Sequence, residues 1–189
     1  MKKYRNWVAL FSQTGSEIVD LSSALNRDPD FVITNANLDE VNPNIEVDFR
    51  INNEEAKTLD ILDNIEFDTN KTLITLNGWL RIVPPDKCKK YNIYNGHPGL
   101  ITKYPELKGK DPQQRAWDNI DNYNKIGSVV HRVVEEVDAG QITNEETIST
   151  KCIGSLDATY NALRTTSFNA WYRFLKERLY IKERLYNKV

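Results

Sequence analysis

The chain has 189 residues with 25 basic and 27 acidic side chains, a formal net charge of -2 and a pI near 5.8. This balance excludes the strong positive field typical of nucleic-acid-binding proteins, and no apolar run is long enough for an export signal or a membrane span. The 2 cysteines and 2 histidines are too few and too widely spaced for a zinc site or a disulfide framework, so we expect a metal-free, cytoplasmic protein.

Short apolar runs alternate with helical patterns along most of the chain. The run 7–11 is continuously apolar and ends in a small polar loop, which is typical of a buried strand that leads into a helix. Strands are predicted at residues 7–11, 31–34, 72–76, 91–94 and 127–134, and helices at residues 18–25, 53–63 and 111–123. This alternation predicts one α/β domain over residues 1–189, with a mostly parallel central sheet and helices on both faces.

Prolines and polar caps refine three of these boundaries. An asparagine is expected to cap the helix 53–63, and residues 84–86, Pro-Pro-Asp, are predicted to form a loop. In the helix 111–123, Asp111 would be the N-cap and Pro112 the first helical residue.

The end of the chain is predicted to be one long amphipathic helix from Ser155 onward. Its apolar stripe recurs at helical spacing and comprises Leu156, Thr159, Tyr160, Leu163, Ser167, Ala170, Trp171 and Phe174. Its tail holds a near-repeat, residues 176–180 and 182–186, which we interpret as a solvated helix end or as a self-association surface that would make a homodimer.

Two segments carry residues suited to acyl transfer. Asn95 and His97 stand two apart at the predicted end of a strand, so an extended backbone directs both side chains to one side while Gly96 faces away. The lone carboxylate of Asp138 follows on a turn of small residues. An amide and an imidazole can stabilise the oxyanion of a tetrahedral intermediate, and a carboxylate can accept a proton. Alternatively, all three residues are purely structural: His97 precedes Pro98 in a loop, and Asn95 and Asp138 serve only to form turns.

The loop between the first predicted strand and helix is a second candidate binding site. It comprises Ser12, Gln13, Thr14, Gly15 and Ser16. Free backbone N–H groups and the dipole at the start of a helix favour an anion such as phosphate. The loop is therefore predicted to bind substrate.

Six stretches of the chain run in an order that resembles the folate-dependent formyltransferases, most closely the glycinamide ribonucleotide formyltransferase branch. They are residues 8–16, 76–84, 95–105, 107–109, 127–131 and 136–140. The ordered set is far more specific than any single motif, and it covers most of the chain up to residue 142. The resemblance implies a Rossmann-like formyltransferase fold with a long C-terminal helix.

The resemblance also implies transfer of a formyl group from 10-formyltetrahydrofolate, a co-substrate, to a primary amine. Glycinamide ribonucleotide of purine biosynthesis is the best single guess for the acceptor. In the family, the residues that match Asn95, His97 and Asp138 are the catalytic set. Asn95 and His97 would bind the oxyanion, while Asp138 would take the amine proton and hold His97 in its charged form. The folate pocket would be formed by Leu80, Arg81, Ile82, Val83, Glu135, Glu136 and Val137.

The acceptor side departs from the family pattern. The nucleotide-binding branch usually has a glycine where this chain has Gln13 and an asparagine where it has Glu17. A carboxylate in the first helical turn suits the helix dipole but repels a phosphate dianion. The acidic residue that the branch uses on the acceptor's ribose falls at Phe168 or Asn169, and a histidine of many members is Gln113 here.

Two other functions are compatible with these residues. One is formyl transfer to another amine, such as an amino sugar or another nucleotide-linked amine. The other is a folate- or nucleotide-binding module without turnover. In each case we expect a small-molecule partner, phosphorylated or not, and neither nucleic acid nor a membrane.

Overall fold

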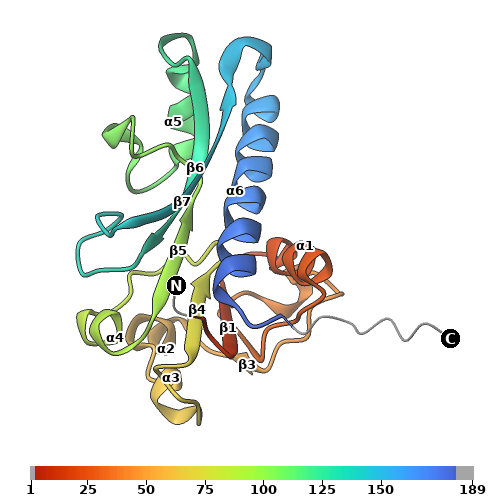
Figure 1. The fold of residues 1–189 in the computed structure, drawn as a ribbon, viewed down its shortest axis with the longest axis vertical. Helices are drawn as coiled ribbons and strands as arrows, with labels where there is room; N and C mark the ends of the chain where they lie inside the picture. The colour runs from red at the N-terminus through yellow and green to blue at the C-terminus, as the bar shows by residue number, and fades with distance from the viewer. Residues whose placement is uncertain (1–2, 182–189) are drawn as a thin grey trace, which may run out of the picture.

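A central sheet organises the molecule, whose computed structural model describes residues 3–181. Within these residues the strand order is β3-β2-β1-β4-β5-β6-β7 (Figure 1). The strands are β1 (Asn6–Phe11), β2 (Phe31–Thr34), β3 (Phe49–Arg50), β4 (Thr72–Leu76), β5 (Ile93–His97), β6 (Lys125–Arg132) and β7 (Ile142–Ser149). Neighbours from β3 to β5 pair in parallel, and β6 and β7 pair antiparallel. The mostly parallel sheet predicted from the sequence is therefore confirmed.

Helices cover both faces of this sheet (Figure 1). They are α1 (Ser16–Leu25), α2 (Asn53–Thr58), α3 (Ile61–Asn64), α4 (Pro85–Lys90), α5 (Pro112–Asp118) and α6 (Leu156–Arg178). Short 3-10 turns lie at Leu38–Glu40, Pro105–Leu107, Ile120–Asn122 and Thr150–Cys152. In the described part of the chain, no helix is long and apolar enough to cross a membrane.

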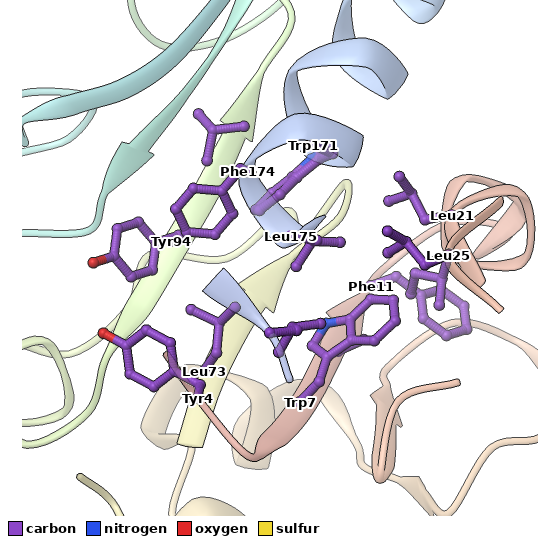
Figure 2. Packing of buried hydrophobic residues seen from close by; sticks show 14 of the residues in the cluster. Tyr4, Trp7, Phe11, Leu21, Leu25, Leu73, Tyr94, Trp171, Phe174 and Leu175 are labelled. Atoms are coloured by element: carbon purple, nitrogen blue, oxygen red, sulfur yellow. The ribbon is translucent and has the colours of Figure 1, made fainter. Parts of the chain in front are cut away.

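Alternation along the strands divides the core between the two faces. In β1, Trp7 and Phe11 join the cluster under α1 and α6, to which α6 contributes Trp171 and Leu175 (Figure 2). Val8 and Leu10 point the other way and join the cluster under α2, α3 and α4. Successive side chains of a strand face opposite sides, so a strand buried on both faces must be apolar throughout. This is why the run 7–11 is continuously apolar.

Several predicted elements are confirmed closely, because burial or capping alone specifies them. β2 and β4 have the predicted bounds, and all five residues of β4 are buried. Asn52 caps α2 through a reciprocal capping box with Glu55. Ser155 caps α6, its hydroxyl accepting from the Ala158 amide, so the long helix begins as predicted. The second half of the near-repeat, residues 182–186, lies outside the described residues.

Other predictions need correction. The helix predicted at 53–63 is broken at Leu59, which adopts a left-handed conformation with φ 55° while its side chain is fully buried. The helix predicted at 111–123 ends at Asp118, and Asp111 is left-handed with no capping hydrogen bond from its side chain. Pro112 does begin that helix.

The remaining differences lie at strand ends and in elements that the sequence analysis missed. The loop predicted at 84–86 is instead the start of α4, which begins at Pro85. The strand predicted at 91–94 lies at Ile93–His97, and the strand predicted at 127–134 lies at Lys125–Arg132. β3 and β7 were not predicted, because β3 has two residues and β7 is polar and largely exposed.

Candidate active site

The carboxyl end of β5 carries Asn95 and His97 on one face of the sheet. Ile93 packs into the core under α2, α3 and α4, so the alternation of the strand places Asn95 and His97 on this same side. Gly96 faces α6, where a Cβ atom would lie 2.2 Å from Trp171 Nε1. Close packing against Trp171 therefore leaves room only for glycine between the two polar side chains.

The antiparallel pairing of β6 brings a further residue, His131, to this site. His131 lies directly across from Asn95, and the Asn95 Nδ2 atom is 3.3 Å from His131 Nε2. A register shift between Val130 and His131 interrupts the pairing with β7, and the Thr143 hydroxyl donates to the Val130 carbonyl there. Bulges of this kind redirect side chains near functional sites.

Asp138 completes the group from the loop that follows β6. Its Oδ2 atom lies 3.3 Å from His97 Nδ1 and accepts a hydrogen bond of 2.8 Å from the Gly109 amide. Its Oδ1 atom lies 3.3 Å from His131 Nε2. We call Asn95, His97, His131 and Asp138 the Asp138 network. Of the three side chains predicted from the sequence, His97 lies beside Asp138 and Asn95 is linked to Asp138 through His131, and their catalytic role stays a prediction.

Backbone geometry fixes the position of Asp138. The residue has a φ of 52°, in the left-handed region that aspartate tolerates better than most residues. Gly140 follows so close to β6 that a Cβ atom would lie 1.7 Å from the Arg132 carbonyl oxygen. The small residues after Asp138 therefore allow the loop to fold back onto the strand and to present the carboxylate to both imidazoles.

The Asp138 network is buried, and its charges are coupled. His97 is 5% exposed, His131 2% and Asp138 9%. Burial opposes ionisation of Asp138, but the hydrogen bond from His131, the nearby His97 and the Gly109 amide lower its pKa to about 2. Asp138 is therefore a carboxylate at neutral pH.

His97 behaves differently from the charged form expected of it. Burial lowers the pKa of His97, and the Asp138 carboxylate and the Leu107 carbonyl offset this only in part. The Nε2–H group donates to the Leu107 carbonyl at 2.8 Å. The neutral ring therefore directs an unprotonated Nδ1 atom at Asp138. A proton that reaches this nitrogen is held by the carboxylate.

His131 links the amide to the carboxylate. Its Nδ1–H group donates to the Arg132 carbonyl at 3.0 Å, which leaves Nε2 to accept from the Asn95 amide when the ring is neutral. The same Nε2 atom would donate to Asp138 when the ring is protonated. Sequence analysis missed this residue. The available signal was a histidine that directly follows two valines in a predicted buried strand.

The first predicted folate segment, residues 80–83, lines a hollow of about 500 Å³. This hollow is lined by Lys57, Leu80, Arg81, Ile82, Val83, Pro84 and Pro85. Leu80 is 59% exposed and Ile82 71%, which is high for large apolar side chains.

The second predicted folate segment, residues 135–137, starts from the same core. Val133, just before it, packs in one buried cluster with Val83. Val137 is 50% exposed, and Glu135 and Glu136 are also exposed. Val137, directly before Asp138, is therefore a solvent-facing apolar side chain at the edge of the Asp138 network.

The predicted anion loop, residues 12–16, is tied to its surroundings by its own side chains. The Ser12 hydroxyl accepts from the Leu80 amide at 3.0 Å, and the Ser16 amide donates to the Thr14 hydroxyl at 3.3 Å. Gln13 lies against Gly78, where its Oε1 atom would be 3.3 Å from a Cβ atom. These contacts occupy groups that a phosphate would otherwise use.

Directly after this loop, Glu17 is held by two side chains from distant parts of the chain. Its Oε1 atom accepts from the Ser167 hydroxyl at 2.6 Å, and its Oε2 atom accepts from Asn77 Nδ2 at 3.0 Å. We call Glu17, Asn77 and Ser167 the Glu17 cluster. No sequence signal links Ser167 to this loop, because only the packing of α6 against α1 brings them together.

The described residues offer no group of three or more His, Cys, Asp or Glu side chains that could hold a metal ion.

Comparison with known proteins supports the resemblance seen in the motifs. Phosphoribosylglycinamide formyltransferase of Dictyostelium discoideum is 38% identical over 80 residues, which are 37% of this chain and 37% of that protein. The trifunctional purine biosynthetic protein adenosine-3 of Homo sapiens is 28% identical over 166 residues, or 79% of this chain and 16% of the human protein. The matched regions thus cover less than half of either relative.

Solved structures show the same fold over nearly the whole chain. Phosphoribosylglycinamide formyltransferase from Anaplasma phagocytophilum matches with a TM-score of 0.74 and 19% identity, over 92% of this chain and 86% of that chain. The enzyme of the same name from Campylobacter jejuni subsp. jejuni matches with a TM-score of 0.74 and 19% identity, over 94% and 98% of the two chains. A formyl transferase family model matches residues 3–174, and the protein therefore belongs to the formyl transferase family.

Proposed function

We propose that this protein transfers a formyl group from 10-formyltetrahydrofolate to a primary amine. The observation that carries the proposal is the Asp138 network, in which an amide, two imidazoles and an ionised carboxylate meet at the end of β5. The names of several relatives make glycinamide ribonucleotide, in purine biosynthesis, the first acceptor to test.

The reaction begins when the amine nitrogen forms a bond to the formyl carbon and the carbonyl electron pair moves to oxygen. The Asn95 amide is the less buried donor of the Asp138 network and would donate to this oxyanion. The developing negative charge also favours protonation of the nearby His97 at Nδ1, which lies 3.3 Å from Asp138, so a positively charged imidazole would offset the charge on the oxyanion.

The tetrahedral intermediate then collapses to products. The attacking nitrogen loses a proton to Asp138, directly or through water, because its carboxylate is ionised and held by His97 and His131. The bond from carbon to N10 of the folate breaks, the carbonyl re-forms, and the proton passes to N10. The products are the formamide and tetrahydrofolate.

The donor would lie against the exposed apolar side chains beside the hollow. Leu80, Ile82 and Val137 offer apolar surface for the pteridine ring, and the backbone of residues 80–83 and 135–137 would read the edge of the ring. The two unpaired cysteines, Cys88 and Cys152, support a reducing cytoplasmic setting. A single domain over residues 1–189 and a homodimer stay predictions.

A formyl-transfer assay tests the proposal. The purified chain is incubated with 10-formyltetrahydrofolate and with glycinamide ribonucleotide, a nucleotide-linked amino sugar or a simple aliphatic amine, and both tetrahydrofolate and formamide are measured. We expect the two products in equal amounts with at least one amine. A reaction without amine is the control, because tetrahydrofolate that forms there comes from hydrolysis of the 10-formyltetrahydrofolate.

The burial of the Asp138 network favours one alternative, a folate-binding module without turnover. His97 and Asp138 already satisfy hydrogen bonds within the protein, as a purely structural network would. If calorimetry shows folate binding while no amine is formylated, this alternative replaces the enzyme proposal.

A further inference from the structure

Arg115 on α5 binds the backbone of the loop 106–109, which follows the start of the short turn Pro105–Leu107. Three successive carbonyl groups of this loop accept hydrogen bonds from its guanidinium, and they belong to Glu106, Leu107 and Lys108. The Nη2 atom lies 3.3 Å from the Leu107 oxygen and 2.8 Å from the Lys108 oxygen. A planar guanidinium presents its donors in a fixed fork, so one side chain holds all three peptide groups in place.

The same loop supplies one backbone group to each of two members of the Asp138 network. The Leu107 carbonyl accepts from His97 Nε2 at 2.8 Å, and the Gly109 amide donates to Asp138 Oδ2 at 2.8 Å. A shift of the loop would therefore move the partner of the imidazole and the partner of the carboxylate together. Arg115 makes no printed contact with either side chain and can act on them only through this backbone and through its charge.

The His97 ring lies between two competing acceptors. The Leu107 carbonyl is 2.8 Å from Nε2, and the Asp138 carboxylate is 3.3 Å from Nδ1. A carboxylate is the stronger acceptor, so a neutral ring without a well-placed carbonyl would carry its single proton on Nδ1. The proton stays on Nε2 only while the carbonyl is held at a short distance. The position of the loop 106–109 therefore decides whether Nδ1 is open to take up a proton.

The charge of Arg115 acts on the same ring. Burial lowers the pKa of His97 most, the Asp138 carboxylate and the Leu107 carbonyl oppose this, and the charges of His131 and Arg115 lower it further. The groups that act on the ring thus come from the loop after β6, from the loop 106–109, from β6 and from α5. The guanidinium therefore favours a neutral His97 before the reaction begins.

We infer that Arg115 is a positioning residue of the Asp138 network: it holds the loop 106–109 so that His97 keeps its proton on Nε2 and leaves Nδ1 open toward Asp138. The inference rests on the proposed function for its catalytic consequence, because an open Nδ1 atom can take up a proton as the oxyanion forms. The position of the proton on the ring can be measured without turnover.

Nitrogen NMR of the histidine rings is the first test. The chain has 2 histidines, so ring-labelled protein gives two sets of signals, and His97→Gln assigns them. At a pH of about 8, where a ring of ordinary or lowered pKa is neutral, wild-type His97 should be protonated at Nε2. Arg115→Gln and Arg115→Lys should each move a large part of the proton to Nδ1, because neither side chain can hold three carbonyl groups. Arg27→Lys is the matched control, since Arg27 also donates to a backbone carbonyl, that of Arg5, but has no contact with the loop 106–109.

Steady-state formyl transfer gives the second measurement. In Arg115→Lys, which keeps the positive charge, kcat should fall by at least about tenfold while the KM of each substrate stays within about twofold, because a misplaced catalytic group slows the chemical step rather than weakening binding. Arg27→Lys should retain the wild-type kcat. An unchanged kcat in an Arg115 variant whose His97 proton has moved would contradict the inference.

The two measurements separate the inference from the proposed function. A wild-type His97 protonated at Nδ1, or the same proton position in wild type and in an Arg115 variant that thermal unfolding shows to be folded, overturns the inference. Arg115→Lys carries this comparison if Arg115→Gln does not fold, and the wild-type spectrum is decisive on its own if neither does. If the proton moves as expected while the wild-type protein formylates no amine, the inference on the geometry stands and the proposed function fails.

Discussion

The Asp138 network and the Glu17 cluster each centre on a carboxylate near the end of the sheet, but their partners differ in kind. Asp138 faces two imidazoles and a backbone amide, which lower its pKa to about 2 despite burial. Glu17 faces a hydroxyl and an amide, and burial raises its pKa. Burial alone therefore does not set the charge of a carboxylate, because partners that can carry positive charge lower its pKa.

The two groups also differ in how complete they are. Every side chain of the Asp138 network has a protein partner, whereas the Asn77 Oδ1 atom of the Glu17 cluster finds none among residues 3–181. A closed network suits chemistry that needs fixed groups. Each substitution below tests one side of this contrast.

The largest effect is expected for Asp138→Asn. The change removes the charge that pairs with both imidazoles and the acceptor of the amine proton, so kcat should fall by about a thousandfold. The affinity for 10-formyltetrahydrofolate, measured by calorimetry, should change little. Asp118→Asn, at the exposed end of α5, is the control and should retain full activity. A kcat within about threefold of wild type would exclude Asp138 as the proton acceptor.

His97→Ala should lower kcat by at least about a hundredfold, the scale of one lost oxyanion donor or acid/base group. Folate affinity should stay nearly unchanged, because His97 is buried and does not line the hollow at residues 80–85. Single-turnover formyl transfer measures the effect on the chemical step. Equal rates in the variant and the wild type would remove His97 from the mechanism.

Ile82→Ser should weaken binding of the folate donor by roughly tenfold, because a largely exposed isoleucine would lose apolar contact with the pteridine. The melting temperature should be unchanged, because the Ile82 side chain is largely exposed and contributes little to the core. Ile148→Ser on β7 is the matched control, since that isoleucine is 40% exposed and does not line the hollow. If the two variants bind the donor alike, the assignment of residues 80–83 to the donor site is wrong.

The smallest expected effect is on the pH dependence of stability. The pKa of His97 lies below its ordinary value of 6.5 in the folded chain, so the unfolded chain binds more protons below that pH. The free energy of unfolding should therefore fall as the pH drops from about 7 to about 5, and His97→Gln should flatten this fall. Asp138 adds a further loss only as the pH drops from 3.8 towards about 2. Urea unfolding at several pH values measures the slope, and equal slopes in both proteins would contradict the prediction.

Elements that burial specifies locally were predictable, and those that depend on neighbours were not. β4 is apolar or threonine throughout and has the predicted bounds. The break at Leu59 was not predictable, because leucine favours a helix and only the buried position of its side chain imposes a left-handed backbone. β7 was not predictable, because it forms an edge of the sheet, has no buried residue and therefore lacks an apolar pattern.

The sequence by itself determined the alternation of strands and helices and the motif order that indicates a formyl transferase, because buried strands and close backbone turns accept few residue types. It also placed Asn95 and His97 on one side of an extended strand. Only the tertiary structure added His131, because antiparallel pairing across β5 and β6 has no local signature. The same holds for Glu17: the helix start was visible in the chain, but its partners Asn77 and Ser167 depend on how α6 packs across the sheet.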